Sequence, residues 1–223
     1  MSEDVRTKLK ASSSGQSMRK RQSPKRKASK KKEQAPEPTV EIQPIEYETQ
    51  AIEETANVLF KPNPGPQTDF LAAAEREVLY GGSAGGGKSY AMLSDPLRYM
   101  GHPAFSGLLL RHTTEELREL VFKSQELYPK IWPGIKWSER KMQWTAPSGA
   151  RLWMSYLDRD DDVLRYQGLA FSWIGFDELT QWATPYAWNY MRSRLRSTAP
   201  DLPIFMRATT NPGGRGHHWV KKM

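Results

Sequence analysis

The stretch GGSAGGGKS, at residues 81–89, decides the fold that we expect for this chain of 223 residues. From Gly82 to Ser89 it fits the pattern G-x-x-x-x-G-K-[ST], after the strand-like run VLY at residues 78–80 and before a helical pattern. In this context the glycines let successive backbone N–H groups point at phosphate oxygens, and the helix N-terminus adds a favourable field. The sequence therefore predicts a P-loop in an α/β nucleotide-binding fold.

The end of this loop carries the groups expected to bind ATP and Mg²⁺. Lys88 is expected to reach the β- and γ-phosphates, and the hydroxyl of Ser89 is expected to serve Mg²⁺. The alternative is a glycine-rich turn without a ligand, and the Lys-Ser pair between a strand and a helix argues against it. The predicted nucleotide-binding residues of the loop are Gly82, Ser83, Ala84, Gly85, Gly86, Gly87, Lys88 and Ser89.

Two acidic residues, Asp177 and Glu178, follow the apolar run WIGF at residues 173–176. Ligand-binding groups lie at the carboxyl ends of parallel strands, so this run is expected to be a central strand beside the P-loop strand. Asp177 would then hold Mg²⁺, and Glu178 would polarise the water that attacks ATP. Alone, such a strand end is a weak signal that also fits a solvated terminus, but together with a P-loop it indicates a hydrolase rather than a small-molecule kinase.

Outward from these motifs, strand-like runs alternate with helical patterns. This alternation predicts a mostly parallel sheet flanked by helices. Two β-like runs around Pro147, Ser148 and Gly149 break the rhythm within residues 136–156 and predict an inserted antiparallel hairpin. The expected strands are 78–82, 107–112, 171–176 and 203–210, and the expected helices are 52–59, 70–75, 88–100, 114–128 and 185–196.

The charge of the chain is concentrated at its N-terminus. Residues 1–32 hold 12 Lys and Arg against two acidic residues, so the formal net charge of +8 leaves residues 33–223 with a net charge of −2. Residues 33–57 then carry seven Glu and no Lys or Arg. Since neither segment can offset its ordering entropy by burial, we expect a disordered tail at 1–45 and a P-loop domain at 46–223. The basic half of the tail could bind DNA, or it could be only a solvated tail.

Composition also excludes several classes of protein. The chain has no cysteine, which removes disulfides, thiolate metal sites and cysteine nucleophiles. No apolar run approaches the roughly 18 residues of a membrane span, and no apolar segment follows the basic N-terminus as in a secretory signal. We therefore expect an intracellular protein without a membrane partner.

Five stretches in the order that the chain presents them carry a family resemblance. They resemble the N-terminal ATPase domain of the large terminase subunit, the DNA-packaging motor of tailed bacteriophages. The stretches are PNPGPQTDFL, YGGSAGGGKS, GLLLRHTTEEL, YQGLAFSWIGFDEL and ATTNPGGRGHHWVKK, within residues 62–222.

The resemblance implies a fold, an activity and partners. The fold would be RecA-like, of the class with an added catalytic glutamate (the ASCE class), and hydrolysis of ATP to ADP and phosphate would drive double-stranded DNA into a procapsid. The implied partners are DNA, a small terminase subunit, the portal ring and further copies of the chain in a ring. The implied place is the cytoplasm of the infected bacterium, transiently at the procapsid portal.

The same resemblance assigns roles to four more residues. Gln67 matches an adenine-recognition segment, although the stretch also reads as a proline-rich loop with an exposed amide. The coupling motif, which senses the γ-phosphate and passes hydrolysis to a domain movement, matches Thr209, Thr210 and Asn211. Its alternative is a strand end that runs into an Asn-Pro-Gly-Gly turn.

An arginine is also expected to neutralise charge that develops on the transferred phosphate. Arg111, at the end of the run GLLLR, is the first candidate, and Arg165 and Arg140 are its competitors. Because motors of this type form rings, the arginine could act on its own site or on a neighbour's. For each of them a surface ion pair is the alternative.

Large terminases also carry a C-terminal nuclease domain, and this sequence ends at Met223, just beyond the coupling motif. We therefore expect no DNA cleavage by this chain alone. Two other functions remain open at this point. One is a helicase or another P-loop remodelling ATPase, which would share the same site residues, and the other is a non-catalytic fragment that binds nucleic acid.

Overall fold

The computed structural model describes residues 60–223. The tail predicted at 1–45 and the helix predicted at 52–59 lie outside these residues. In the described part, no helix has the length and apolar character needed to cross a membrane. The helices and strands, with 3₁₀ helices written η, are α1 (Pro66–Ala72), β1 (Glu77–Gly81), α2 (Lys88–Ser94), η1 (Asp95–Tyr99), β2 (Ser106–Arg111), α3 (Thr114–Ile131), β3 (Lys136–Ser138), β4 (Gln143–Thr145), β5 (Arg151–Tyr156), η2 (Asp160–Tyr166), β6 (Trp173–Phe176), η3 (Leu179–Gln181), α4 (Tyr186–Arg192), β7 (Phe205–Thr210) and α5 (His217–Val220).

The strands form one mixed sheet in the order β1-β7-β6-β2-β5-β4-β3. The five strands from β1 to β5 in this order pair in parallel. The hairpin of β4 and β5 pairs antiparallel, and β3 extends it. The predicted mostly parallel sheet with an antiparallel hairpin is therefore confirmed, and β5 makes the hairpin continuous with the main sheet.

One expectation about the order of strands is wrong. The strand that ends at Asp177 was expected beside the P-loop strand, but β7 lies between them and pairs with both β1 and β6. All six residues of β7 are buried, as suits a strand with neighbours on both sides. Pairing between distant strands depends on the whole sheet, so the local sequence of β6 could not decide it.

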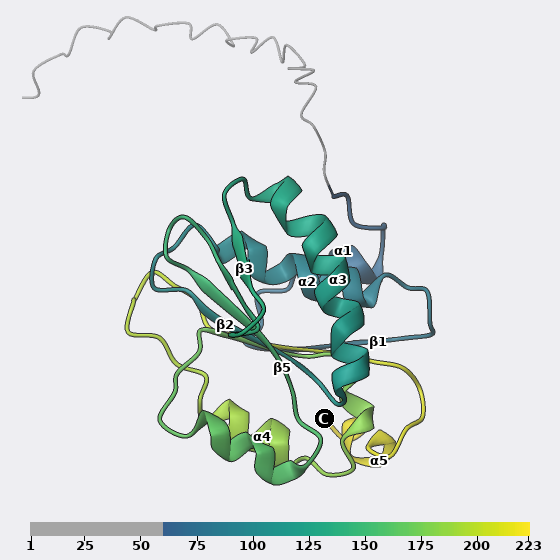
Figure 1. Cartoon of the computed structure of the whole chain (residues 1–223). Helices are drawn as coiled ribbons and strands as arrows, with labels where there is room; N and C mark the ends of the chain where they lie inside the picture. The colour runs from purple at the N-terminus through teal and green to yellow at the C-terminus, as the bar shows by residue number, and fades with distance from the viewer. Residues whose placement is uncertain (1–59) are drawn as a thin grey trace, which may run out of the picture. The chain divides into compact units, whose positions relative to one another are not determined.

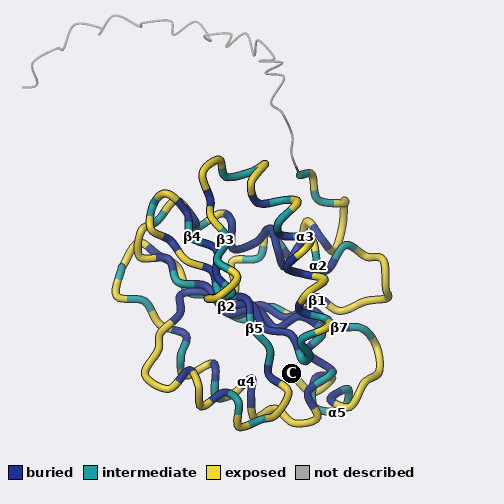
Figure 2. Tube along the Cα trace, in the orientation of Figure 1, coloured by how far each residue is buried: buried dark blue, intermediate teal, exposed yellow. Residues whose placement is uncertain are grey.

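Alternate residues of the central strands face two hydrophobic cores, because side chains point to opposite faces of a sheet in turn. Leu109 of β2 packs with α1, α2 and α3, whereas Leu108 and Leu110 pack with α4, α5 and η2. Figure 1 shows α1, α2 and α3 on one side of the sheet and α4 and α5 on the other. In Figure 2 the strands are buried and the connecting loops are exposed. The result is a three-layer α/β/α domain that brings loops together at the carboxyl edge of the sheet.

Several helices differ in length from the expectation, for local reasons. The helix predicted at 88–100 ends at Ser94 and continues as η1, since Pro96 cannot donate the backbone hydrogen bond that an α-helix needs. α3 begins after Thr113, whose hydroxyl accepts a hydrogen bond from the Glu116 N–H at 3.3 Å, and it runs to Ile131 rather than 128. α4 spans less than the predicted 185–196. These details matter because α2 and α3 both border the site.

Candidate nucleotide-binding site

The loop between β1 and α2 has the backbone shape of a phosphate-binding loop. Gly85 and Gly87 have φ angles of 83° and 74°, in the left-handed region that favours glycine. Gly87 also leaves no room for a side chain, because a Cβ there would lie 2.6 Å from Gln67 Nε2. Two glycines of the motif, Gly85 and Gly87, are thus favoured by backbone conformation, and Gly87 also by close packing.

Lys88, the first residue of α2, is buried and folds back over the loop. Its Nζ donates hydrogen bonds to the carbonyl oxygens of Gly82 at 3.1 Å and Ser83 at 2.6 Å. A buried ammonium needs such partners, and the phosphates of a nucleotide would offer stronger, charged ones. The loop therefore holds Lys88 at the position where a phosphate-binding lysine is needed.

A pocket of about 360 Å³ opens beside this loop. Arg111 and Glu178, predicted as site residues from distant parts of the sequence, line it together with the loop. Three residues that the motifs did not indicate line it too: Tyr90 from α2 and the pair Glu119 and Lys123 from α3. The one signal for that pair in the sequence is its i,i+4 spacing on a helix that follows β2 directly. The full lining is Ala84, Gly85, Gly86, Gly87, Lys88, Ser89, Tyr90, Arg111, Glu119, Lys123, Glu178 and Asn211.

Asp177 follows β6 directly and is fully buried behind the pocket. Its Oδ1 accepts a hydrogen bond from the Thr209 hydroxyl, and its Oδ2 lies 3.3 Å from Arg111 Nη1. Burial raises the pKa of Asp177, and the Arg111 charge and the Thr209 hydrogen bond oppose the rise. Within residues 60–223, Asp177 Oδ2 has no hydrogen-bond donor. Asp177 does not line the pocket itself, and this oxygen faces Arg111, which does.

Glu178 has an unusual backbone conformation that aims its side chain. Its φ and ψ angles are 61° and 53°, a left-handed conformation that costs a non-glycine residue about 1–2 kcal/mol. Its N–H donates to Thr209 Oγ1 at 3.1 Å, and its carboxylate accepts from Asn211 Nδ2 at 2.6 Å and from Asn211 N at 3.3 Å. Burial raises the pKa of Glu178, and the charge of Asp177 raises it further.

Thr209 and Thr210 of the predicted coupling motif end β7 and Asn211 follows it, but the three residues do not share one environment. Thr209 and Asn211 contact the acidic pair, as described above. The Thr210 hydroxyl instead donates to Thr180 Oγ1 at 2.8 Å. Because β7 lies between β1 and β6, Thr209 and Asn211 join the strand that leads into the P-loop to the strand that carries the acids.

Gln67 lies behind the P-loop rather than at an open surface. Its side chain is buried, its Oε1 accepts from Asn63 N at 2.6 Å, and its Nε2 donates to Gly87 O at 2.8 Å. The amide therefore ties α1 to the last residue of the loop. Its predicted contact with adenine is not tested by these hydrogen bonds and stays a prediction.

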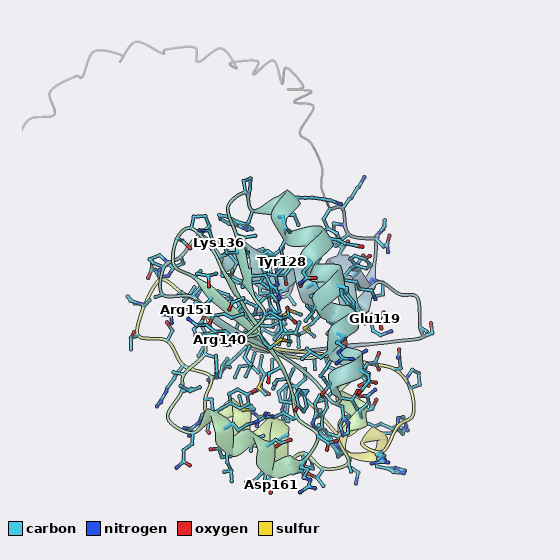
Figure 3. The ribbon with its side chains drawn as sticks, viewed as in Figure 1. Glu119, Tyr128, Lys136, Arg140, Arg151 and Asp161 are labelled. Atoms are coloured by element: carbon cyan, nitrogen blue, oxygen red, sulfur yellow. The ribbon has the colours of Figure 1, made fainter. Side chains whose placement is uncertain are left out.

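The three candidate arginines lie in different places. Arg111 is in the pocket wall, with its guanidinium against Asp177. Arg165 donates a hydrogen bond from Nη2 to Tyr156 O at 2.6 Å, and neither it nor Arg140 lines the pocket. Figure 3 labels Arg140 among the strands of the hairpin. The action of Arg111 on a phosphate stays a prediction, and its place in the pocket wall is compatible with it.

The donor set suits a hard divalent cation that keeps most of its water. Within the described residues, no group of three or more His, Asp or Glu could hold a metal ion by itself. One carboxylate oxygen of Asp177 without a donor and one hydroxyl of Ser89, beside a phosphate loop, are what Mg²⁺ uses when it shares its ligands with a nucleotide. The residues present therefore fit Mg²⁺ as a companion of bound nucleotide.

Solved structures of phage large terminases share this fold. The large terminase of a thermophilic bacteriophage matches with a TM-score of 0.55 and 16% sequence identity, over 73% of this chain and 42% of that one. The large terminase of bacteriophage HK97 matches with a TM-score of 0.51 and 14% identity, over 73% of this chain and 36% of that one. This chain thus matches less than half of the length of either terminase. In sequence it matches neither a described protein family nor a curated protein. The resemblance predicted from the motifs is confirmed at the level of the fold.

Proposed function

We propose that residues 46–223 form an Mg²⁺-dependent ATPase domain, with residues 1–45 as its tail, and that hydrolysis of ATP to ADP and phosphate drives double-stranded DNA into a procapsid. The observation that carries the ATPase proposal is the meeting of the P-loop with Glu178 and Asn211 in one pocket. Lys88 on one side and Asp177 on the other complete a phosphate site with an acidic pair.

Each residue of the pocket then has a chemical role. The loop N–H groups and Lys88 bind the phosphates of ATP, and Arg111 neutralises charge on the γ-phosphate from the pocket wall. Ser89 and Asp177 would hold Mg²⁺, which when bound neutralises phosphate charge. Gln67, behind the loop, is proposed to recognise adenine.

Hydrolysis itself is assigned to Glu178. Its carboxylate orients a water in line with the γ-phosphorus and accepts a proton as the water oxygen bonds to that phosphorus. The bond from the γ-phosphorus to the bridging oxygen of ADP breaks, and ADP and phosphate leave. A raised pKa favours this role, because a stronger base accepts the proton more readily.

Thr209, Thr210 and Asn211 are proposed to couple hydrolysis to movement. The hydrogen bonds of Asn211 to both oxygens of Glu178 support this role, since a change in the charge or position of the carboxylate must be felt at the end of β7. The partners proposed from the fold likeness are duplex DNA, a small terminase subunit, the portal ring and further copies of the chain in a ring. The proposed place is the cytoplasm of an infected bacterium.

The test is Mg²⁺-dependent ATP hydrolysis by the purified chain, with and without linear duplex DNA. We expect Glu178→Gln to lower turnover by about 10²–10⁴-fold while nucleotide still binds, as for the loss of a general base. Lys88→Ala should lose nucleotide binding itself, and duplex DNA should stimulate the wild type. Turnover that survives in Glu178→Gln would contradict the catalytic assignment, and stimulation by single-stranded but not duplex DNA would contradict the packaging function.

A further inference from the structure

Two charged residues of α3 face the pocket as an ion pair. Lys123 Nζ lies 2.5 Å from Glu119 Oε1, and the two residues are one helical turn apart. Figure 3 labels Glu119 beside the half of α3 that is nearer its N-terminus. The ammonium also lies 5.8 Å from the centre of the Tyr90 ring, which α2 presents at the same pocket. An aromatic face supports a cation at this distance, so Lys123 is held at the mouth of the site.

Lys123 is bound to its partner less firmly than the other two cations of the pocket, Lys88 and Arg111, are bound to theirs. Lys88 donates to two carbonyl oxygens of the loop, and Arg111 faces the buried Asp177. The side chain of Glu119 is 61% exposed and that of Lys123 is 28% exposed. Exposed i,i+4 pairs on helices are weak, so Lys123 can exchange Glu119 for another anion at little cost.

The pocket also brings Lys123 together with the acidic end of the site. Lys123 lines the pocket with Arg111 and Glu178. Glu178 follows Asp177 at the end of β6 and marks the side of the pocket where water would attack the nucleotide. A cation that acts on this side is placed for the terminal phosphate rather than for the base.

We propose that Lys123 binds the γ-phosphate of ATP in its own chain, and that Glu119 holds it in place while the pocket has no nucleotide. This inference rests on the proposed function and adds a residue that tells ATP from ADP. In the ATP-bound site, Lys123 leaves Glu119, swings over Tyr90 and forms a charge-assisted hydrogen bond with a γ-phosphate oxygen. ADP offers no such oxygen, so it leaves the Glu119–Lys123 pair in place.

The test compares the affinities of two nucleotides, by titration calorimetry on the whole chain with Mg²⁺. The probes are ADP and the imidodiphosphate analogue of ATP, which keeps the γ-phosphate and is not hydrolysed. We expect Lys123→Gln to weaken the ATP analogue by about tenfold and ADP by less than about threefold, since one charge-assisted contact is lost. Lys123→Arg should restore most of the difference, and Glu119→Gln should not weaken the ATP analogue.

Lys130, on the same helix but outside the pocket, supplies the matched control. Lys130→Gln should leave both affinities as in the wild type. Equal weakening of both nucleotides by Lys123→Gln, or no weakening at all, would overturn the inference while leaving the ATPase proposal intact. A wild type that binds neither nucleotide would overturn both, and thermal unfolding of Lys123→Gln and Lys123→Arg checks that each variant is folded.

Discussion

Asp95 and Asp177 are both fully buried, and each faces an arginine. Arg207 Nε lies 3.5 Å from Asp95 Oδ2, and Arg111 Nη1 lies 3.3 Å from Asp177 Oδ2. The two pairs are therefore alike in distance and in the burial of the acid. They differ in what surrounds them, and that difference suits a structural role for the first pair and the ligand-binding role that we propose for the second.

The pair of Asp95 and Arg207 has fixed partners at every polar atom except Arg207 Nε, which makes no hydrogen bond within residues 60–223. Asp95 Oδ2 accepts from Trp173 Nε1 at 2.7 Å, and Oδ1 is bonded to Arg98. Arg207 donates from Nη1 to Glu75 O at 2.7 Å and from Nη2 to Ala73 O at 2.8 Å. Its guanidinium also lies 4.2 Å from the Phe205 ring centre. These contacts join β7, β6, η1 and the segment after α1, so this pair stabilises the domain as a unit.

In the part of the chain that the structure describes, the pair of Asp177 and Arg111 leaves three polar atoms without a hydrogen bond, against one in the other pair. Within residues 60–223, Asp177 Oδ2 and both Nε and Nη1 of Arg111 make no hydrogen bond. Arg111 faces the pocket, whereas Arg207 is wholly enclosed. Buried polar groups are nearly always hydrogen-bonded, so a group of unpaired atoms at the edge of a pocket indicates a ligand site. Under the proposed function, the cost of burial would be recovered when the nucleotide binds.

The largest effect that we predict follows from breaking the ion pair of Asp95 and Arg207. Asp95→Asn should lower the free energy of unfolding by about 3–5 kcal/mol, because Arg207 would remain as a buried charge without its anion. Asp177→Asn should cost less than about 1 kcal/mol, because the raised pKa of Asp177 means that its ionised form is poorly stabilised in the fold. Urea unfolding of the nucleotide-free chain measures both.

The two variants serve as controls for each other, since each replaces one buried aspartate by its amide. Asp177→Asn should abolish turnover while remaining folded, and Asp95→Asn should keep nucleotide binding for as long as it is folded. Equal losses of stability in the two variants would show that Asp177 is as structural as Asp95, and the comparison would then be wrong.

A predicted effect of intermediate size, on turnover, tests how Asp177 is positioned. Thr209→Val removes the hydroxyl that donates to Asp177 Oδ1 and accepts from Glu178 N. We expect turnover to fall by about 10–100-fold, as for other residues that orient a metal ligand, with a small change in stability. Steady-state hydrolysis at saturating ATP measures the effect.

Thr209→Ser is the matched variant, because it keeps the hydroxyl and loses only a methyl group. It should retain most of the turnover. If Thr209→Ser were as slow as Thr209→Val, packing of the methyl group rather than the two hydrogen bonds would be responsible.

The contrast between the pairs also shows what the sequence could and could not predict. The residues of the P-loop, Asp177 and Glu178 could be proposed from the sequence because local chemistry demands them at fixed spacing after a strand, and their roles stay predictions. The pair of Asp95 and Arg207 joins residues 112 positions apart, and no local pattern marks either of them. Their contact depends on β7 entering the sheet between β1 and β6, which was also missed.

The same reason explains why Lys123 was missed. Its spacing from Glu119 is common on exposed helices and carries no information about a pocket. The face of α3 that borders the site is decided by the burial of Leu117, Leu120 and Val121 against the sheet. Burying such a side chain contributes about 1.5–3 kcal/mol, so packing fixes the helix and only then is Lys123 directed to the pocket.

The smallest predicted effect is a pH dependence of the contribution that Asp177 makes to stability. Asp177 has a pKa raised above its ordinary value of 3.8, chiefly by burial. Between 3.8 and the raised value, the folded state binds a proton that the unfolded state does not. The contribution of Asp177 to stability therefore grows as the pH falls through the raised pKa.

Wild type and Asp177→Asn, both without nucleotide, should consequently diverge on acidification. The wild type should gain on the order of 1 kcal/mol relative to the variant for each unit by which the pKa is raised. Urea unfolding of both proteins at a series of pH values from neutral down to the ordinary pKa of 3.8 measures the difference, and effects of the other carboxylates largely cancel in it. If acidification instead stabilised Asp177→Asn relative to the wild type, the charge of Arg111 would outweigh burial in setting the pKa of Asp177. The contrast between the two pairs would then be wrong.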